Sequence, residues 1–111
     1  MSDLEIKRAL VSVSNKDNLG ELVKYFIKYN VEVLSSGGTY NFLKKLDSSL
    51  MVQEISEFTN FKEILDGRVK TLHPLIHGGI LAKKNNPHHL SQLKKLKIPP
   101  VDLVVVNLYP F

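Results

Sequence analysis

The 111-residue sequence contains no cysteine and no tryptophan. It has few arginines, namely Arg8 and Arg68, and its other basic residues are lysines and histidines. The absence of cysteine excludes disulfides and thiolate-bound metals. No apolar run approaches the roughly 18 residues of a membrane-spanning helix. The first residues, Met1–Glu5, carry acids in place of the apolar segment of a secretory signal. We therefore expect a cytoplasmic protein of one domain at most, without a membrane partner.

The net charge of +4 comes from lysines that are spread along the chain. They form small clusters at Lys44–Lys45, Lys83–Lys84 and Lys94–Lys97. The neighbouring residues are typical of solvated helix faces and loops, and this composition favours such faces over a nucleic-acid surface. We expect no nucleic-acid partner.

Alternating strand-like and helix-like patterns predict an α/β fold, a parallel sheet with helices on both faces. Short, β-branched apolar runs predict strands at residues 8–14, 31–35, 51–55 and 101–108. The last run is apolar on both sides, which predicts an interior strand covered by helices. Apolar residues at helical spacing predict three helices. The first spans residues 19–27, and the second follows the glycine turn with Thr39 as its N-cap. The third spans residues 87–97, with Leu90, Leu93 and Leu96 packed.

The connection between the third and fourth strands is harder to interpret. Residues 61–65 predict a helical turn. Gly78 and Gly79 indicate close backbone approach at 77–82 rather than a long helix. His73 and His77 are four residues apart, but Pro74 between them does not fit a helical metal site. We therefore expect no metal and a structural role for the histidines.

Polar segments follow the predicted strands, at the edge where parallel sheets bind ligands. They are Ser12–Lys16, Ser36–Thr39 and Asn107–Tyr109, with Arg68–Thr71 in the long connection. Gly37 and Gly38 leave backbone N–H groups accessible, and the helix after them adds positive potential. These features predict a phosphate site. Taken alone, the glycine pair is better explained by a tight connection.

Three side chains have two interpretations each. Arg68 and Lys70 are two residues apart, so in an extended loop both point to one side and could bind an anion. A surface salt bridge with Glu63 or Asp66 explains them equally well. Tyr109 could stack on a base or donate from its hydroxyl, or it could cover the edge of the core.

Five segments together resemble a known family, the inosine monophosphate (IMP) cyclohydrolase domain of bifunctional purine biosynthesis proteins. The resemblance covers essentially the whole chain. The segments are Ser12–Lys16 (SVSNK), Ser36–Thr39 (SGGT), Asp66–Pro74 (DGRVKTLHP), His77–Ala82 (HGGILA) and Val101–Phe111 (VDLVVVNLYPF). This family has a methylglyoxal-synthase-like fold and acts as a hydrolase that closes the second purine ring by dehydrating a formamido imidazole carboxamide ribonucleotide.

The resemblance also implies the roles of individual residues. Lys70 would lie near the reacting carboxamide and formyl groups, and Tyr109 near the atoms that close the ring. Asn107 would contact the base. The remaining residues would bind the phosphate and ribose: Ser14, Lys16, Ser36, Gly37, Gly38, Thr39, Arg68 and Thr71. The partners implied are the purine nucleotide substrate and product.

The family pattern continues beyond what this sequence contains. A later Asp-Ile-Gly-Gly stretch, a proton-transferring lysine and the formyltransferase (transferase) domain have no counterpart here, so residues 1–111 are interpreted as the N-terminal portion of one cyclohydrolase domain. The resemblance implies no cofactor for ring closure, since 10-formyltetrahydrofolate belongs to the formyltransferase. It implies a homodimer for the full-length protein, and we expect the segment alone to be inactive or nearly so.

Two other functions use the same fold. One is a regulatory module that binds nucleotide phosphate without catalysis. The other is methylglyoxal synthase, which needs a catalytic aspartate beside its phosphate loop, and only Asp66 is a candidate in this loop. Lys70 and Tyr109 favour the cyclohydrolase, because phosphate binding alone requires neither.

Overall fold

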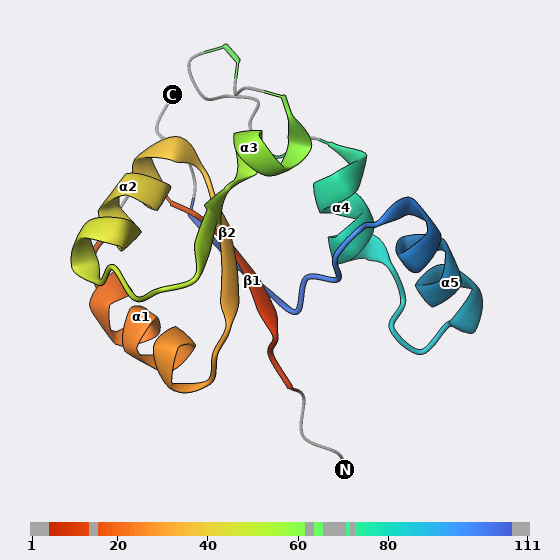
Figure 1. The fold of residues 1–111 in the computed structure, drawn as a ribbon, viewed down its shortest axis with the longest axis horizontal. Coiled ribbons are helices and arrows are strands. Elements are labelled where there is room, and N and C mark those ends of the chain that lie inside the picture. Colours follow the sequence, from red (N-terminus) through yellow and green to blue (C-terminus); the bar gives the residue numbers. More distant parts are fainter. Residues whose placement is uncertain (1–4, 14–15, 62–63, 66–70, 72, 108–111) are drawn as a thin grey trace.

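The computed structural model describes residues 5–13, 16–61, 64–65, 71 and 73–107 (Figure 1). The strands in this part of the chain are β1 (Arg8–Ser12), β2 (Glu32–Ser35), β3 (Val52–Glu54) and β4 (Leu103–Val106). The helices are α1 (Leu19–Lys28), α2 (Gly37–Leu46), α3 (Ile55–Thr59), α4 (Pro74–Leu81) and α5 (Pro87–Leu96). The predicted strands are therefore confirmed, each slightly shorter than expected.

The strands form one parallel sheet in the order β3-β2-β1-β4. Val11 pairs with Ser35 on one side and with Val105 on the other, and Ser35 pairs with Glu54. All four strands therefore end at the same edge of the sheet. The predicted α/β fold is confirmed.

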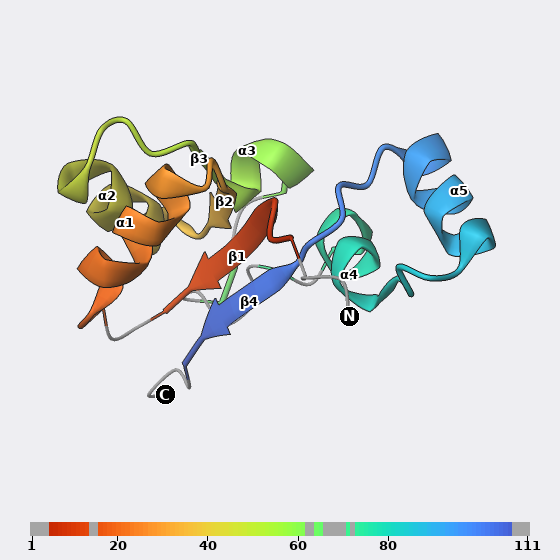
Figure 2. The ribbon, with the colours of Figure 1, turned by 90° about the horizontal axis from the view of Figure 1, so that it is seen from below.

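Helices α1 and α2 cover one face of the sheet (Figure 2). Leu19, Val23 and Phe26 of α1 are buried because their spacing places them on one side of the helix. Phe26 is 1% exposed and lies in a core cluster with Val11 and other strand residues. Leu43 of α2 is buried in the same cluster, so α1 and α2 share one hydrophobic layer.

Helices α3 and α4 contribute to a second core on the opposite face, where Ile55 and Ile76 pack with Leu10 and Leu34. α5 lies beyond α4, away from the sheet (Figures 1 and 2). Of its residues only Leu93 is buried, so the prediction that Leu90 and Leu96 are packed is wrong; they are 41% and 62% exposed. Leu90, Leu93 and Leu96 do have helical spacing, but the described residues cover only part of the helix face that they form.

The prediction of an interior last strand is also wrong for the part of the chain that the structure describes. β4 is at the end of the strand order and pairs with β1. Val104 and Val106, on one side of β4, are 42% and 60% exposed. The start of this region is fixed by Asp102, whose carboxylate accepts the N–H groups of Lys7 and Arg8 at 2.9 and 3.2 Å.

Between β3 and β4 the helices differ from the prediction. Helix α3 ends before the segment 61–65, where a helical turn was expected and where residues 62 and 63 lie outside the described part of the chain. Residues 77–81, where close backbone approach was expected rather than a long helix, belong to the eight-residue helix α4. His73 caps α4, because its Nδ1 accepts the Leu75 N–H at 3.0 Å. This confirms a structural role for His73. Pro74 occupies the first turn, where a missing N–H costs nothing.

The close backbone approach expected at the glycine pair is present inside α4. Gly79 is buried, and its carbonyl accepts the Val101 N–H at 3.0 Å. A Cβ on Gly79 would collide with the carbonyl oxygen of Pro99. In the described part of the chain, none of the helices combines the length and apolar character needed to cross a bilayer.

Candidate phosphate-binding site

The start of α2 lies at the edge where the strands end. Ser36 is its N-cap residue and Gly37 its first residue, so the prediction of Thr39 as N-cap is wrong. The Ser36 side chain makes no capping hydrogen bond, and its Oγ lies 3.2 Å from the Oγ of Ser12 at the end of β1. The first N–H groups of a helix have no acceptor within it. The first N–H groups of α2 therefore lie at this edge without a capping hydrogen bond from the Ser36 side chain.

Thr39 fastens this helix start to the sheet. Its side chain is 1% exposed; Oγ1 donates to the Val13 carbonyl at 3.1 Å and accepts the Val13 N–H at 3.3 Å. Both hydrogen-bonding functions of the hydroxyl therefore serve the backbone that follows β1. Thr39 positions the site in this structure, and it could meet a ligand through its backbone N–H.

Ser35 is a buried polar residue directly beneath the start of α2. It is the last residue of β2, it is fully buried, and its Oγ has no hydrogen-bond partner among the described residues. A buried hydroxyl without a partner costs about 1–3 kcal/mol of folding free energy. The N–H groups at the positive end of α2, which follows Ser35 and Ser36, are suited to an anion with several acceptor oxygens.

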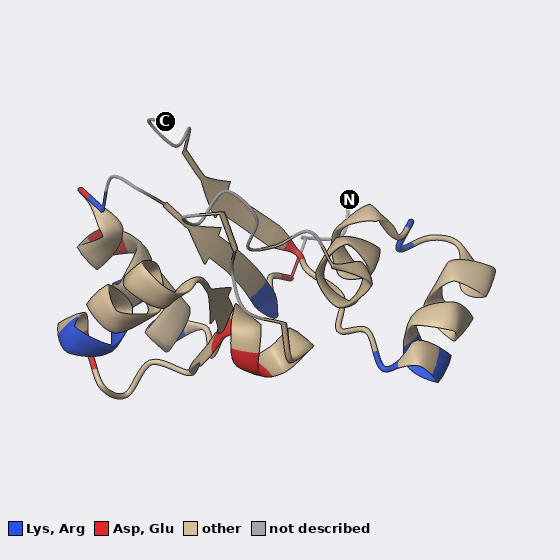
Figure 3. Ribbon diagram, turned by 90° about the horizontal axis from the view of Figure 1, so that it is seen from above, with Lys and Arg blue, Asp and Glu red and all other residues tan. Residues whose placement is uncertain are grey.

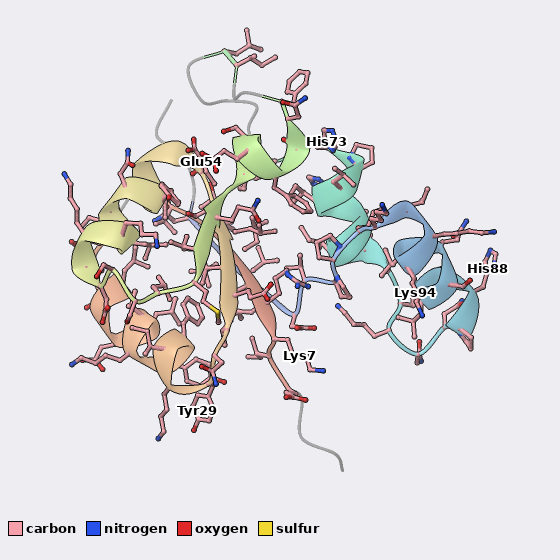
Figure 4. The ribbon with its side chains drawn as sticks, in the orientation of Figure 1. Lys7, Tyr29, Glu54, His73, His88 and Lys94 are labelled. Atoms are coloured by element: carbon pink, nitrogen blue, oxygen red, sulfur yellow. The ribbon has the colours of Figure 1, made fainter. Side chains whose placement is uncertain are left out.

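Glu54 is a residue of the site that the sequence analysis missed. It ends β3, and its Oε1 accepts the Ser56 hydroxyl at 3.1 Å (Figure 4). The same oxygen lies 3.3 Å from where a Cβ on Gly37 would be, so the missing side chain gives the carboxylate room. The carboxylate is favourable at the positive helix end, where it would compete with a phosphate. Its place at the end of a predicted strand was the signal that could have found it.

Four other predicted residues are described. Gly38 is the second residue of α2 and is exposed. Lys16 Nζ donates to the Val13 carbonyl at 3.2 Å, and Thr39 binds the same carbonyl. Asn107 directly follows β4 and is exposed at the edge of the sheet. Thr71 precedes α4, and its carbonyl accepts the His73 N–H at 2.8 Å. None of the described contacts joins Thr71 to the start of α2.

The other predicted residues lie outside the part of the chain that the structure describes, so their placement stays a prediction. These residues are Ser14, Arg68, Lys70 and Tyr109. Within the described ranges, no three histidine, aspartate or glutamate side chains gather where they could hold a metal. A cavity of about 390 Å³ lies elsewhere, near the starts of β1 and β2, with Arg8, Glu32, Phe58 and Pro99 among its lining residues. It shares no residue with the predicted phosphate site, which is an open sheet edge.

The fold and this edge define a class of protein. Residues 18–111 match the family described as MGS-like domain, and the chain belongs to that family.

More particular similarity is to bifunctional purine biosynthesis protein PurH. The chain is 56% identical to PurH of Clostridium perfringens over 105 residues, 57% to that of Clostridium acetobutylicum over 106, and 53% to that of Leptospira biflexa over 108. These matches cover 95–97% of the chain but 21% of each relative, so the chain spans about a fifth of their length. The crystal structure of ForH is also similar, with a TM-score of 0.76 and 32% identity, covering 96% of this chain and 54% of that one.

Proposed function

We propose that this chain forms the phosphate-binding part of an IMP cyclohydrolase and holds a purine ribonucleotide by its 5′-phosphate at the start of α2. The observation that carries this proposal is the start of α2 at the edge where the strands end, because its N-cap residue Ser36 makes no side-chain capping hydrogen bond. The similarity to PurH supports a nucleotide of purine biosynthesis as the ligand.

The proposed reaction forms a C–N bond. The carboxamide nitrogen of the substrate attacks its formyl carbon, and water leaves after proton transfers. A phosphate held far from these atoms contributes orientation, which brings the two groups of the substrate together. In this proposal Lys70 and Tyr109 lie near the reacting atoms, Asn107 contacts the base, and Lys16 extends the phosphate loop.

Gly38→Asp tests the anion site. Nothing lies within 4 Å of a Cβ added at Gly38, so the substitution fits the fold. A carboxylate in the first turn of α2 favours the helix but repels phosphate. We expect the affinity for IMP, measured by titration calorimetry, to fall about tenfold or more.

Gly38→Asn is the matched control, since it has the same size without the charge, and it should bind more tightly than the aspartate variant. Inosine, which lacks the phosphate, should bind weakly to all three proteins. Equal IMP affinity for the aspartate and asparagine variants would contradict the phosphate site.

Lys70→Ala separates catalysis from simple phosphate binding. A chimera tests it, in which this chain replaces the matching segment of Clostridium perfringens PurH, which is 56% identical. We expect the chimera to close the purine ring. Because general acid–base and positioning groups contribute about 10²–10⁴-fold, we expect Lys70→Ala to lower turnover by that order.

In the same chimera, Lys70→Ala should leave IMP binding nearly unchanged. If both the chimera and its alanine variant closed the ring at the parent rate, Lys70 would have no catalytic role. An inactive but IMP-binding chimera would instead favour the regulatory alternative.

A further inference from the structure

Residues 73–101, called here the basic lobe, contain α4, α5 and the segments beside them. They include Lys83, Lys84, Lys94, Lys95 and Lys97, and the sequence has no aspartate or glutamate from Gly67 to Val101. Five lysines exceed the net charge of +4 of the whole chain, so the rest of the chain is slightly negative. Figure 3 shows blue on α5 and on the connection from α4, and no red on α4, α5 or their connection.

The charge of this lobe is mostly uncompensated. Lys84 has a described ion pair, with Asp102 at 3.8 Å, and it also donates to the Val101 carbonyl at 2.8 Å. Within the described residues no carboxylate pairs with the other four lysines of the lobe. A positive potential therefore extends about 8–10 Å from this surface at moderate ionic strength.

An apolar groove of about 270 Å³ runs between α4 and α5. Gly78 and Leu81 of α4 and the next residue, Ala82, line it on one side, and Leu93 and Leu96 line it from α5. Leu81 is 73% exposed and Leu96 is 62% exposed. Two leucines with so much free surface, on opposite walls of one groove, are typical of a binding site for an apolar partner surface.

The geometry of the groove fits a helix. On α5 its lining residues recur at positions 89, 92, 93 and 96, which is one face of a helix. On α4 the small residues Gly78 and Ala82 leave space for close approach. Lys83 directly follows Ala82 at the end of one wall, and Lys95 lies between the lining residues Leu93 and Leu96 in the sequence of α5. Leucines would fill such a groove while acids reach the lysines around it.

We propose that this groove docks an acidic amphipathic helix of a partner protein. The described lobe contains no arginine and no phenylalanine, tyrosine or tryptophan. Nucleic-acid surfaces rely on such residues for phosphate forks and base stacking. The exposed leucines instead call for apolar side chains, and the lysines for carboxylates. The proposal is independent of the phosphate site, which lies at the sheet edge.

The test uses a fluorescent synthetic helix of about 18 residues, roughly five turns, with leucines every third or fourth position and glutamates elsewhere. We expect the protein to bind it in fluorescence anisotropy, more weakly as salt rises. Leu81→Asp and Leu96→Asp should each reduce the affinity about tenfold or more. Both side chains are exposed, so circular dichroism should show an unchanged fold.

Leu46→Asp on α2 is the matched control, because Leu46 is 44% exposed but lies outside the lobe; this variant should bind like the wild type. A peptide with lysines in place of the glutamates should not bind. The proposal is overturned if the acidic peptide fails to bind at low salt, if the basic peptide binds equally, or if Leu81→Asp and Leu96→Asp change nothing. Tighter binding of an RNA oligomer or of anionic vesicles, insensitive to the leucine variants, would also overturn it.

Discussion

Gly79→Ala is expected to lower the free energy of unfolding by about 3 kcal/mol or more, the upper range for overpacking a core. The added methyl would fall on the carbonyl oxygen of Pro99 and press against Val101 at 3.3 Å. The Pro99 oxygen belongs to the backbone and has no rotamer with which to move away. The Gly79 carbonyl also accepts the Val101 N–H at 3.0 Å, so a shift of α4 would stretch that bond. Urea unfolding followed by circular dichroism measures the change.

Gly20→Ala and Gly78→Ala provide the comparison. Nothing lies within 4 Å of a Cβ at Gly20, so this change should leave stability equal or raise it by up to about 1 kcal/mol through helix propensity. A Cβ at Gly78 would meet the end of the Ile98 side chain at 3.1 Å, which can rotate, so its effect should lie between the two. The same unfolding midpoint for all three variants would show that Gly79 has no special packing role.

Thr39→Val is expected to lower the free energy of unfolding by about 1–3 kcal/mol, which is less than the loss expected for Gly79→Ala. Valine has nearly the same shape, but it leaves the Val13 N–H and carbonyl without the hydroxyl that binds both at 3.3 and 3.1 Å. We also expect weaker IMP binding, because the start of α2 is no longer fastened to the end of β1.

Thr39→Ser separates the hydroxyl from the methyl group. It keeps both hydrogen bonds and loses one buried methyl, which costs about 1 kcal/mol. Serine should therefore retain IMP affinity that valine loses. If valine bound IMP as tightly as the wild type, Thr39 would have no positioning role.

Much of the fold could be predicted because its signals are local. The β-branched runs around Leu10 and Leu34 and the spacing of Leu19, Val23 and Phe26 require no knowledge of distant partners. α4 also had local signals, since Pro74 after His73 is a typical helix start. The close backbone approach expected at the glycine pair is present, but it occurs inside a helix, where Gly79 packs against the Pro99 carbonyl.

Other features depend on contacts between distant segments and could not be predicted. Apolar residues on both sides of β4 say nothing about which strands lie beside it. The pairing of Ser12 with Ser36, which leaves α2 without a side-chain cap, is set by the register of β1 and β2. The same holds for Glu54, since only the neighbouring strand places its carboxylate against Gly37.

The position of β1 in the sheet has a consequence for synthesis on the ribosome. Arg8 pairs with Glu32, a short distance along the chain, whereas Ala9 pairs with Leu103. One edge of β1 can therefore pair early in translation, while the other stays unpaired until β4 has emerged. Closing so long a loop is slow, and an exposed strand edge invites pairing with other chains. The nascent protein is thus open to misassociation along this edge until β4 has been made.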